Sequence, residues 1–192
     1  MWLEILERDH KLPARMFQRV AATVFGEEMD DVAKTAMHRP EFFGQPFLAL
    51  VREALRAPSF WTVGEREYMA AVTSRVNACD FCALVHTETA RITACGEVDV
   101  DTGAGRPELS AVLALLERVS RDDVAAEDIA RVRAAGVPED AIADALAVNL
   151  VFNIVNRLAN AFGWSWDSDD HLQAGARGLR RFGYKLPGLV LR

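Results

Sequence analysis

The sequence predicts an all-α fold in a single domain that spans residues 1–192. No segment of useful length alternates apolar and polar residues as a half-buried strand does. Apolar residues instead recur at helical spacing, between the Pro and Gly residues that typically begin and end helices. The chain is 51% hydrophobic, and at this length it can bury a sizeable core. We therefore expect a helical bundle.

The first half of the chain supplies five expected helices. Pro13 begins one that Gly26 ends, an arrangement in which each residue suits its end of a helix. Two more are expected at 30–38 and 47–57, each stopped before a proline.

The next two helices contain the most informative segment. Thr62 and Glu65 form the pattern of a capping box, which predicts a helix that runs to about Asn77. The following helix is expected over 80–95 and closes at Gly96.

Residues 97–108, rich in Gly and Asp, are expected to form a loop. This loop is the only plausible internal break, and it is too short to establish a domain boundary. Four further helices are expected after it, at 108–121, 126–136, 138–163 and, more weakly, 168–183.

Composition argues against several classes of partner. The net charge is −6 with both signs interspersed, and no Lys/Arg block marks a nucleic-acid or anionic-membrane surface. No uninterrupted apolar run reaches the roughly 18 residues of a membrane span, and the N-terminus lacks the pattern of a signal peptide. We expect a soluble, cytoplasmic protein with no nucleic-acid or membrane partner.

The three cysteines are Cys79, Cys82 and Cys95. An odd number without a secretion signal argues against a structural disulfide framework. In a reducing compartment, the CxxC pair is more often catalytic or metal-binding. Cys95 is expected to be buried, because a free cysteine packs like a small apolar residue.

The segment "CDFCALVH" places reactive groups at the start of a helix. Cys82 and His86 are four residues apart and share a helix face. Cys79 lies at or just ahead of the helix N-terminus, where free N–H groups favour a thiolate. A neutral imidazole one turn along can accept a thiol proton. This spacing supplies a nucleophile, a base and a second thiol that can close a disulfide.

A histidine base works better when a third group orients it, and the preceding helix offers Glu65 and Glu67. The capping box is expected to occupy Glu65. Glu67 shares a helix face with the small residues Ala71, Ser74 and Ala78, which would let the next helix approach closely. Spacing favours Glu67 but does not settle the choice.

The segment "EYMAAVTSRVNACDFCALVHTETA" resembles the signature of the AhpD-like alkylhydroperoxidases, within the carboxymuconolactone decarboxylase superfamily. That signature is a glutamate, eleven residues, CxxC, three residues and a histidine, and Glu67, Cys79, Cys82 and His86 match it. The flanking "LRAPSFWTVGERE" and "VNRLANAFGW" are similar to peroxidase-related members, so the likeness covers roughly residues 40–165. It implies an AhpD-like helical bundle and a homo-oligomer.

The resemblance also implies a reaction, that of an antioxidant thiol-dependent peroxidase. Cys82 would attack a small hydroperoxide and Cys79 would resolve the sulfenic acid as a redox-active disulfide. His86 would be the base and Glu67 its proton-relay partner. No bound cofactor or metal is implied, and the reductant would be an external dithiol, of lipoyl type, on a thiol reductant protein.

Alternatives stay open from the sequence. Phe81 stands where some relatives carry a second relay histidine, so the CxxC pair would react with little turnover, as in a redox sensor. Zinc could bind Cys79, Cys82, His86 and either Cys95 or Glu67, although a second ligand pair is missing. A decarboxylase-type member is a further alternative, but such members typically lack the CxxC pair.

Four asparagines form a narrow polar stripe on the apolar segment 146–162, since they are spaced i, i+4, i+7 and i+11: Asn149, Asn153, Asn156 and Asn160. Two interpretations remain open. The stripe either lines the active site or a polar subunit contact, or it is a thin solvent-facing edge.

Overall fold

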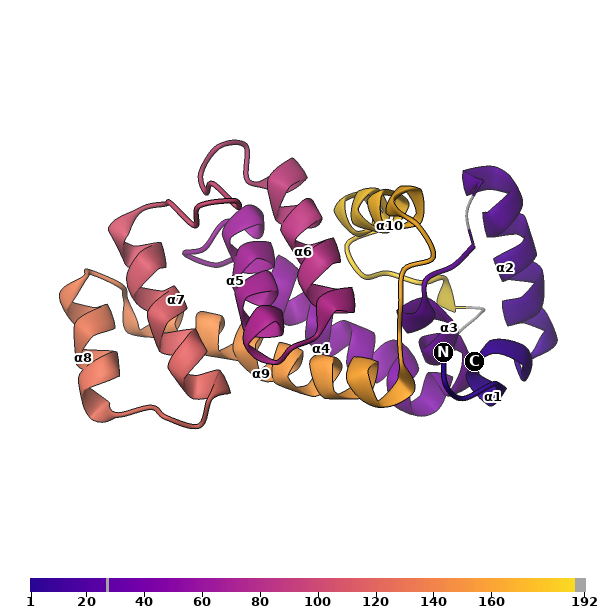
Figure 1. Ribbon diagram of the computed structural model, residues 1–192, viewed down its shortest axis with the longest axis horizontal. Helices are drawn as coiled ribbons and strands as arrows, with labels where there is room; N and C mark the ends of the chain where they lie inside the picture. Colours follow the sequence, from indigo (N-terminus) through magenta and orange to yellow (C-terminus); the bar gives the residue numbers. More distant parts are fainter. Residues whose placement is uncertain (27, 189–192) are drawn as a thin grey trace.

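The computed structural model describes residues 1–26 and 28–188, and within these ranges every regular element is helical. Figure 1 shows the arrangement. In chain order the elements are α1 (Ile5–Arg8), α2 (Leu12–Phe25), α3 (Asp31–His38), the π-helical turn η1 (Pro40–Gly44), α4 (Gln45–Arg56), α5 (Val63–Val76), α6 (Asp80–Thr93), α7 (Pro107–Ser120), α8 (Ala126–Ala134), α9 (Glu139–Phe162) and α10 (Asp169–Phe182). The all-α prediction is confirmed.

The expected helices form within two residues of their expected limits: α4 begins two residues early, and α6 and α8 each end two residues early. The short elements α1 and η1 were not predicted from the sequence. The capping box does form: the Thr62 side chain accepts from the Glu65 backbone N–H at 3.2 Å, and the Glu65 carboxylate accepts from the Thr62 backbone at 2.9 Å.

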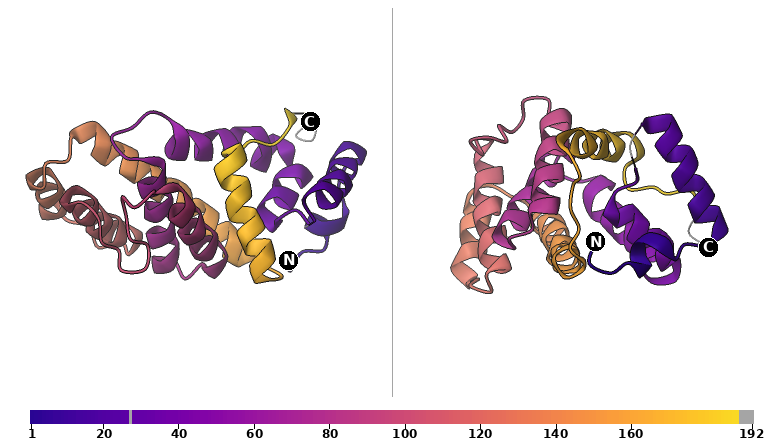
Figure 2. Two further views of the ribbon diagram at one scale, coloured as in Figure 1. Left: turned by 90° about the horizontal axis from the view of Figure 1, so that it is seen from above. Right: turned by 45° about the vertical axis from the view of Figure 1, so that its right-hand side comes forward.

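The centre of the bundle is an α5–α6 hairpin that stands beside the long α9 (Figures 1 and 2). Gly64 allows α5 and α6 to lie close together, because a Cβ there would come within 2.3 Å of the Ala94 Cα. α7 also packs on α5, α4 on α9 and α10 on α6. The thiol motif therefore lies inside the bundle.

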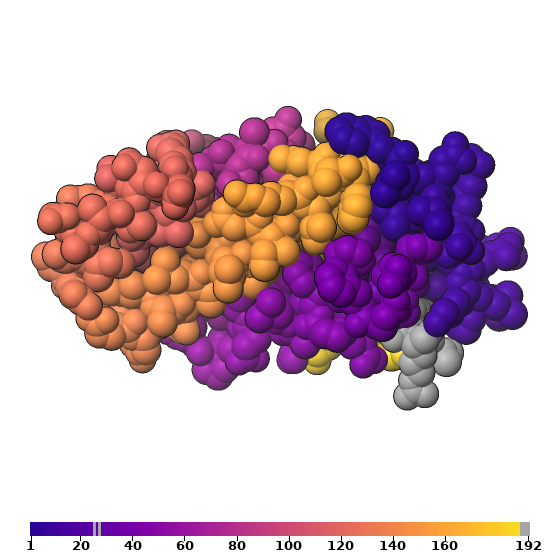
Figure 3. All heavy atoms as spheres, turned by 90° about the horizontal axis from the view of Figure 1, so that it is seen from below, coloured from indigo at the N-terminus to yellow at the C-terminus, as the bar shows by residue number. Residues whose placement is uncertain are grey.

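Among the described helices, only α9 is long and apolar enough to cross a membrane. Half of its most apolar window is buried against other helices, mainly α4, α5 and α7. Its outer face forms a band across the surface in Figure 3. Leu150 and Ile154 of this helix are exposed. These contacts are those of a packing helix at the core of a bundle.

α2 stands at one end of the molecule, at the opposite end from α8 (Figure 1). It presents an outward stripe of Leu12, Met16, Val20 and Val24, which are 58–67% exposed. A contiguous apolar stripe of this kind is typical of a contact surface.

Candidate active site

The two motif thiols lie at the start of α6. Cys79 is the N-cap residue and Cys82 is in the first turn, and each is a free thiol that is only 1% exposed. The turn before them is tight: Ala78 has a φ of 50°, and the Cys79 backbone N–H donates to the Ser74 carbonyl at 2.9 Å. The sequence predicted this position for Cys79.

The pKa values of the two thiols are shifted in opposite directions. The Cys82 side chain and the Cys82 backbone N–H donate to Cys79, and against the opposing effect of burial they lower the pKa of Cys79 to about 7. The interaction with Cys79, together with burial, raises the pKa of Cys82. Of the two thiols, Cys79, at the helix N-terminus, is therefore the one that more readily ionises.

Glu67, and not Glu65, contacts the motif histidine. The Glu67 carboxylate is fully buried, and its Oε2 lies 2.6 Å from Nδ1 of His86. Glu65 is held elsewhere, by the capping box and by a bidentate contact from Arg106 at 2.7 and 2.9 Å. The capping box thus occupies Glu65 and leaves Glu67 as the partner of His86, which is the choice that spacing favoured.

Two residues that the sequence analysis missed complete the surroundings of Glu67. Arg56, at the end of α4, donates to Oε1 at 2.5 Å. The Tyr184 hydroxyl, beyond the end of α10, lies 2.8 Å from Oε1 and 3.1 Å from Oε2. We call Arg56, Glu67, His86 and Tyr184 the carboxylate cluster. No local pattern marks either residue, since Arg56 lies on a different helix from Glu67 and Tyr184 lies 117 positions from it along the chain.

The carboxylate cluster fixes the charges of its members. Burial alone would raise the pKa of Glu67, but the hydrogen bond with His86 and the charge of Arg56 hold that pKa below its ordinary value. Burial and the charge of Glu67 raise the pKa of Tyr184 well above its ordinary value. Glu67 is thus an anion, and Tyr184 is a neutral donor.

His86 is packed tightly among aromatic residues. Its ring meets Phe152 edge-on, with centroids 4.5 Å apart, and lies nearly parallel to Tyr184 at 6.4 Å. Within the described residues, Nε2 forms no hydrogen bond, and neither ring nitrogen bonds to a sulfur. The structure brings His86 to Glu67 and, among the described residues, forms no hydrogen bond between His86 and either thiol.

The asparagine stripe faces α5 and the turn before α6. Asn156 donates to the Ser74 hydroxyl at 2.9 Å and accepts from the Asn77 side chain at 2.9 Å. Asn149 donates to the Thr73 hydroxyl at 3.1 Å. We call Ser74, Asn77, Asn149, Asn153 and Asn156 the amide cluster.

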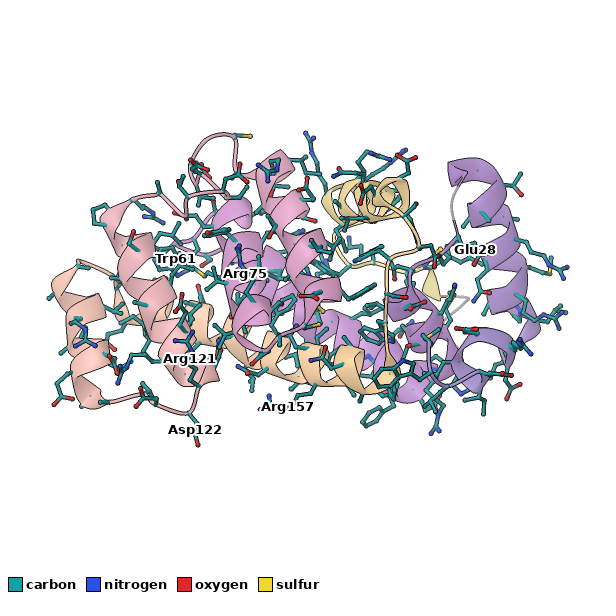
Figure 4. All side chains as sticks on the ribbon, in the orientation of Figure 1. Glu28, Trp61, Arg75, Arg121, Asp122 and Arg157 are labelled. Atoms are coloured by element: carbon teal, nitrogen blue, oxygen red, sulfur yellow. The ribbon has the colours of Figure 1, made fainter. Side chains whose placement is uncertain are left out.

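The solvent-edge interpretation of the stripe is wrong for most of its length. Asn149 and Asn156 are 1% and 0% exposed, and only Asn160, at the end, is exposed. Asn160 donates to the carbonyls of Asn77 and Ala78 at 3.2 and 3.3 Å. The Asn156 side chain also interacts with both thiols and favours their ionised forms. The neighbouring Arg157 points away from the bundle (Figure 4).

Phe81, at the position where some relatives carry a histidine, packs against an aromatic side chain. Phe81 stacks on Trp166, with ring centroids 4.5 Å apart, and its carbonyl accepts from the Trp166 indole at 2.9 Å.

The expectation that Cys95 is buried is wrong: it follows the end of α6 in a left-handed conformation, and it is exposed. The helix ends early, and this turns Cys95 toward solvent.

The thiols have no set of metal ligands around them. Within residues 1–26 and 28–188, no group of three His, Cys, Asp or Glu side chains is arranged to hold a metal ion. Cys95 lies past the far end of α6, a helix whose 14 residues span about 20 Å. Arg56 and Tyr184 occupy the oxygens of Glu67. Of the two fourth ligands considered from the sequence, Cys95 is thus distant from the thiols, and the Glu67 oxygens already accept hydrogen bonds.

The sequence matches no protein-family model and no curated protein. Its fold is nevertheless similar to solved structures. One is the "alkylhydroperoxidase AhpD core: uncharacterized peroxidase-related protein" from Ralstonia eutropha JMP134, with a TM-score of 0.70 and 24% identity over 88% of this chain and 92% of that one. Another is an uncharacterized peroxidase-related protein from Silicibacter sp. TM1040, with a TM-score of 0.69 and 20% identity over 83% and 87%. The chain therefore has an AhpD-like fold.

Proposed function

We propose that the protein is a thiol-dependent peroxidase that reduces small hydroperoxides with Cys79 and Cys82. The observation that supports this most directly is the pair of free, buried thiols at the start of α6, one with a pKa of about 7. A thiolate at a helix N-terminus is the reactive form of cysteine. The AhpD-like fold and the peroxidase-related neighbours agree with this proposal.

The reaction proceeds in three balanced steps. The Cys82 thiolate attacks one peroxide oxygen, the O–O bond breaks, and the alcohol leaves with a proton while Cys82 becomes a sulfenic acid. The Cys79 thiolate attacks that sulfur, an S–S bond forms, the S–O bond breaks, and the hydroxide that leaves takes a proton from solvent to become water. An external dithiol, of lipoyl type, then donates two electrons and two protons and restores both thiols. No bound cofactor takes part.

His86 supplies the base in this scheme. The proton that remains on Cys82 in the reduced pair must leave before Cys82 can attack. Nε2 of His86 is the free ring nitrogen. Because no hydrogen bond joins Nε2 to the sulfurs in the described structure, the proton passes through a water molecule or after a small movement of the side chains.

The lowered pKa of Cys79 favours a second order of events, in which Cys79 attacks the peroxide and Cys82 resolves. The two orders predict different trapped intermediates. Cys79→Ser leaves a stable sulfenic acid on Cys82 in the first order. Cys82→Ser leaves it on Cys79 in the second.

The decisive experiment is stopped-flow reduction of cumene hydroperoxide and hydrogen peroxide with dihydrolipoamide as donor. We expect Cys82→Ser to abolish turnover and Cys79→Ser to stop after one equivalent of peroxide. Cys95→Ser is the matched control and keeps full activity, because Cys95 is exposed and lies beyond the end of α6. Full turnover by both motif variants would refute the proposal and leave a redox-sensing or decarboxylase-type role.

We also propose that the protein is a cytoplasmic homo-oligomer. The exposed apolar stripe of α2 supports a contact with a second copy. A reducing compartment suits the free thiols, since a dithiol donor is available there to restore them.

A further inference from the structure

We infer that Arg56 and Tyr184 keep Glu67 permanently ionised, so that Glu67 orients His86 as a fixed anion and carries no proton itself. Tyr184 and Arg56 are then positioning residues for the histidine base. The inference rests on the proposed function, because it concerns the same base. It differs from the relay role that the resemblance implies for Glu67.

The hydrogen bonds of Glu67 leave little capacity for a proton. Its two oxygens receive three donor groups at 2.5 to 3.1 Å, from Arg56, His86 and Tyr184. Arginine does not lose its proton in proteins. The raised pKa of Tyr184 keeps its hydroxyl protonated. A carboxylate that accepts several such bonds is a weak base.

The two donors also hold each other in place. The Arg56 guanidinium lies over the Tyr184 ring, 4.9 Å from its centroid, and also approaches the Leu179 carbonyl at 3.5 Å. Tyr184 has a φ of 67° and directly follows Gly183, with a φ of 56°. A left-handed tyrosine is conformationally unfavourable, and here it directs the hydroxyl at the carboxylate. The donor therefore comes from a segment beyond α10, outside residues 40–165.

A fixed anion at Nδ1 decides which nitrogen of His86 acts as base. With Glu67 ionised, Nδ1 carries the hydrogen that Glu67 accepts, and Nε2 is left as the basic nitrogen. This is the role of an orienting carboxylate beside a catalytic histidine. The guanidinium balances the negative charge, so the resting cluster needs no further proton.

The test measures the protonation of Glu67 directly, by infrared difference spectra and by ¹⁵N NMR of the histidine ring. Glu67→Gln identifies the carboxyl band. In the wild-type protein we expect no protonated Glu67 on either side of the Cys79 transition, near its pKa of about 7, and an Nδ1–H tautomer of His86. A protonated Glu67 in this range, or an Nε2–H tautomer, would overturn the inference.

Tyr184→Phe and Arg56→Met sharpen the test, because removing a donor to a charged group raises the pKa of Glu67. We expect the acid limb of peroxide reduction to move to higher pH, with a loss of about tenfold in rate at that limb for Tyr184→Phe and no change on the high-pH plateau. A purely structural role would lower the rate equally at every pH and would contradict the inference.

Each substitution has a matched control. Tyr68 is the other tyrosine of the chain; it directly follows Glu67 on α5, but its ring lies against the Arg75 guanidinium, 5.2 Å from the ring centroid. Arg52 is exposed one turn before Arg56 on α4. Tyr68→Phe and Arg52→Met should leave the profile unchanged. If the wild-type protein shows no peroxidase activity, the proposed function fails, and the spectra of Glu67 and His86 still decide this inference.

Discussion

Two buried polar clusters are built on α5, and they differ in charge. The carboxylate cluster, near the start of α5, pairs an anion with a cation, and its donors come from α4, α6 and the segment after α10. The amide cluster, near the end of α5, is neutral and joins α5 to α9. The carboxylate cluster therefore sets the protonation of its own members, while the amide cluster holds the turn that carries the thiols. Only the first should respond strongly to pH.

Removing the anion should have the largest effect on stability. Glu67→Gln leaves Arg56, whose side chain is only 14% exposed, without its charge partner, and breaking a buried pair costs about 3 kcal/mol. The pKa of Glu67 is lowered in the folded protein, so its stabilisation is complete above the ordinary value of 4.5 and is lost as the pH falls through the lowered pKa. Urea unfolding at several pH values should show this acid loss in the wild-type protein, and a weaker one in the variant.

A matched control for that change is Glu139→Gln, at an exposed pair with Arg133. Its unfolding curve should stay close to that of the wild-type protein. Equal effects of the two substitutions would remove the distinction between a buried and an exposed charge.

Replacing the central amide should have a smaller effect that does not vary with acid. Asn156→Leu removes the hydrogen bonds of Asn156 with Ser74 and Asn77, at about 1 kcal/mol each, so we expect a cost of about 2 kcal/mol. The Ser74 hydroxyl keeps its bond to the Ala70 carbonyl, and the Asn77 side chain keeps its bond to Asn153. The substitution also removes a side chain that lowers the pKa of Cys79, so the pH midpoint of alkylation by iodoacetamide should rise. Unfolding curves and alkylation rates across pH measure both effects. A strong acid dependence of the stability loss would contradict the neutral character assigned to the amide cluster.

The smallest effect is expected at the exposed end of the stripe. Asn160→Ala removes hydrogen bonds to the carbonyls of Asn77 and Ala78, and solvent can replace them, so the cost is about 0.5 kcal/mol. The alkylation midpoint of Cys79 should not move. A shift as large as that of Asn156→Leu would show that the turn, and not the buried amide, controls the thiol.

Local spacing predicted the parts of the site that lie on one hairpin. The capping box assigned Glu65 to the helix start and left Glu67 for His86, and the structure shows that contact. The same reasoning placed Cys79 at the start of α6. It was wrong for Cys95, because the end of a helix depends on the turn that follows as well as on apolar spacing.

The asparagine stripe shows what residue spacing can and cannot predict. Its periodicity determined that four amides share one face of α9, but periodicity cannot say which neighbour that face meets. The structure supplies Thr73, Ser74 and Asn77 as partners. Buried amides require such partners, and their identity depends on how α9 packs against α5.

The sequence by itself determined the all-α fold and the helix-start position of the thiols, and it favoured Glu67 over Glu65 as the partner of His86, because these features depend on residues a few helical turns apart. Only the tertiary structure decided that Arg56 and Tyr184 reach the same carboxylate, since Tyr184 lies 117 positions from Glu67 along the chain. Contacts of that separation form through packing of whole helices, and no local pattern of residues records them.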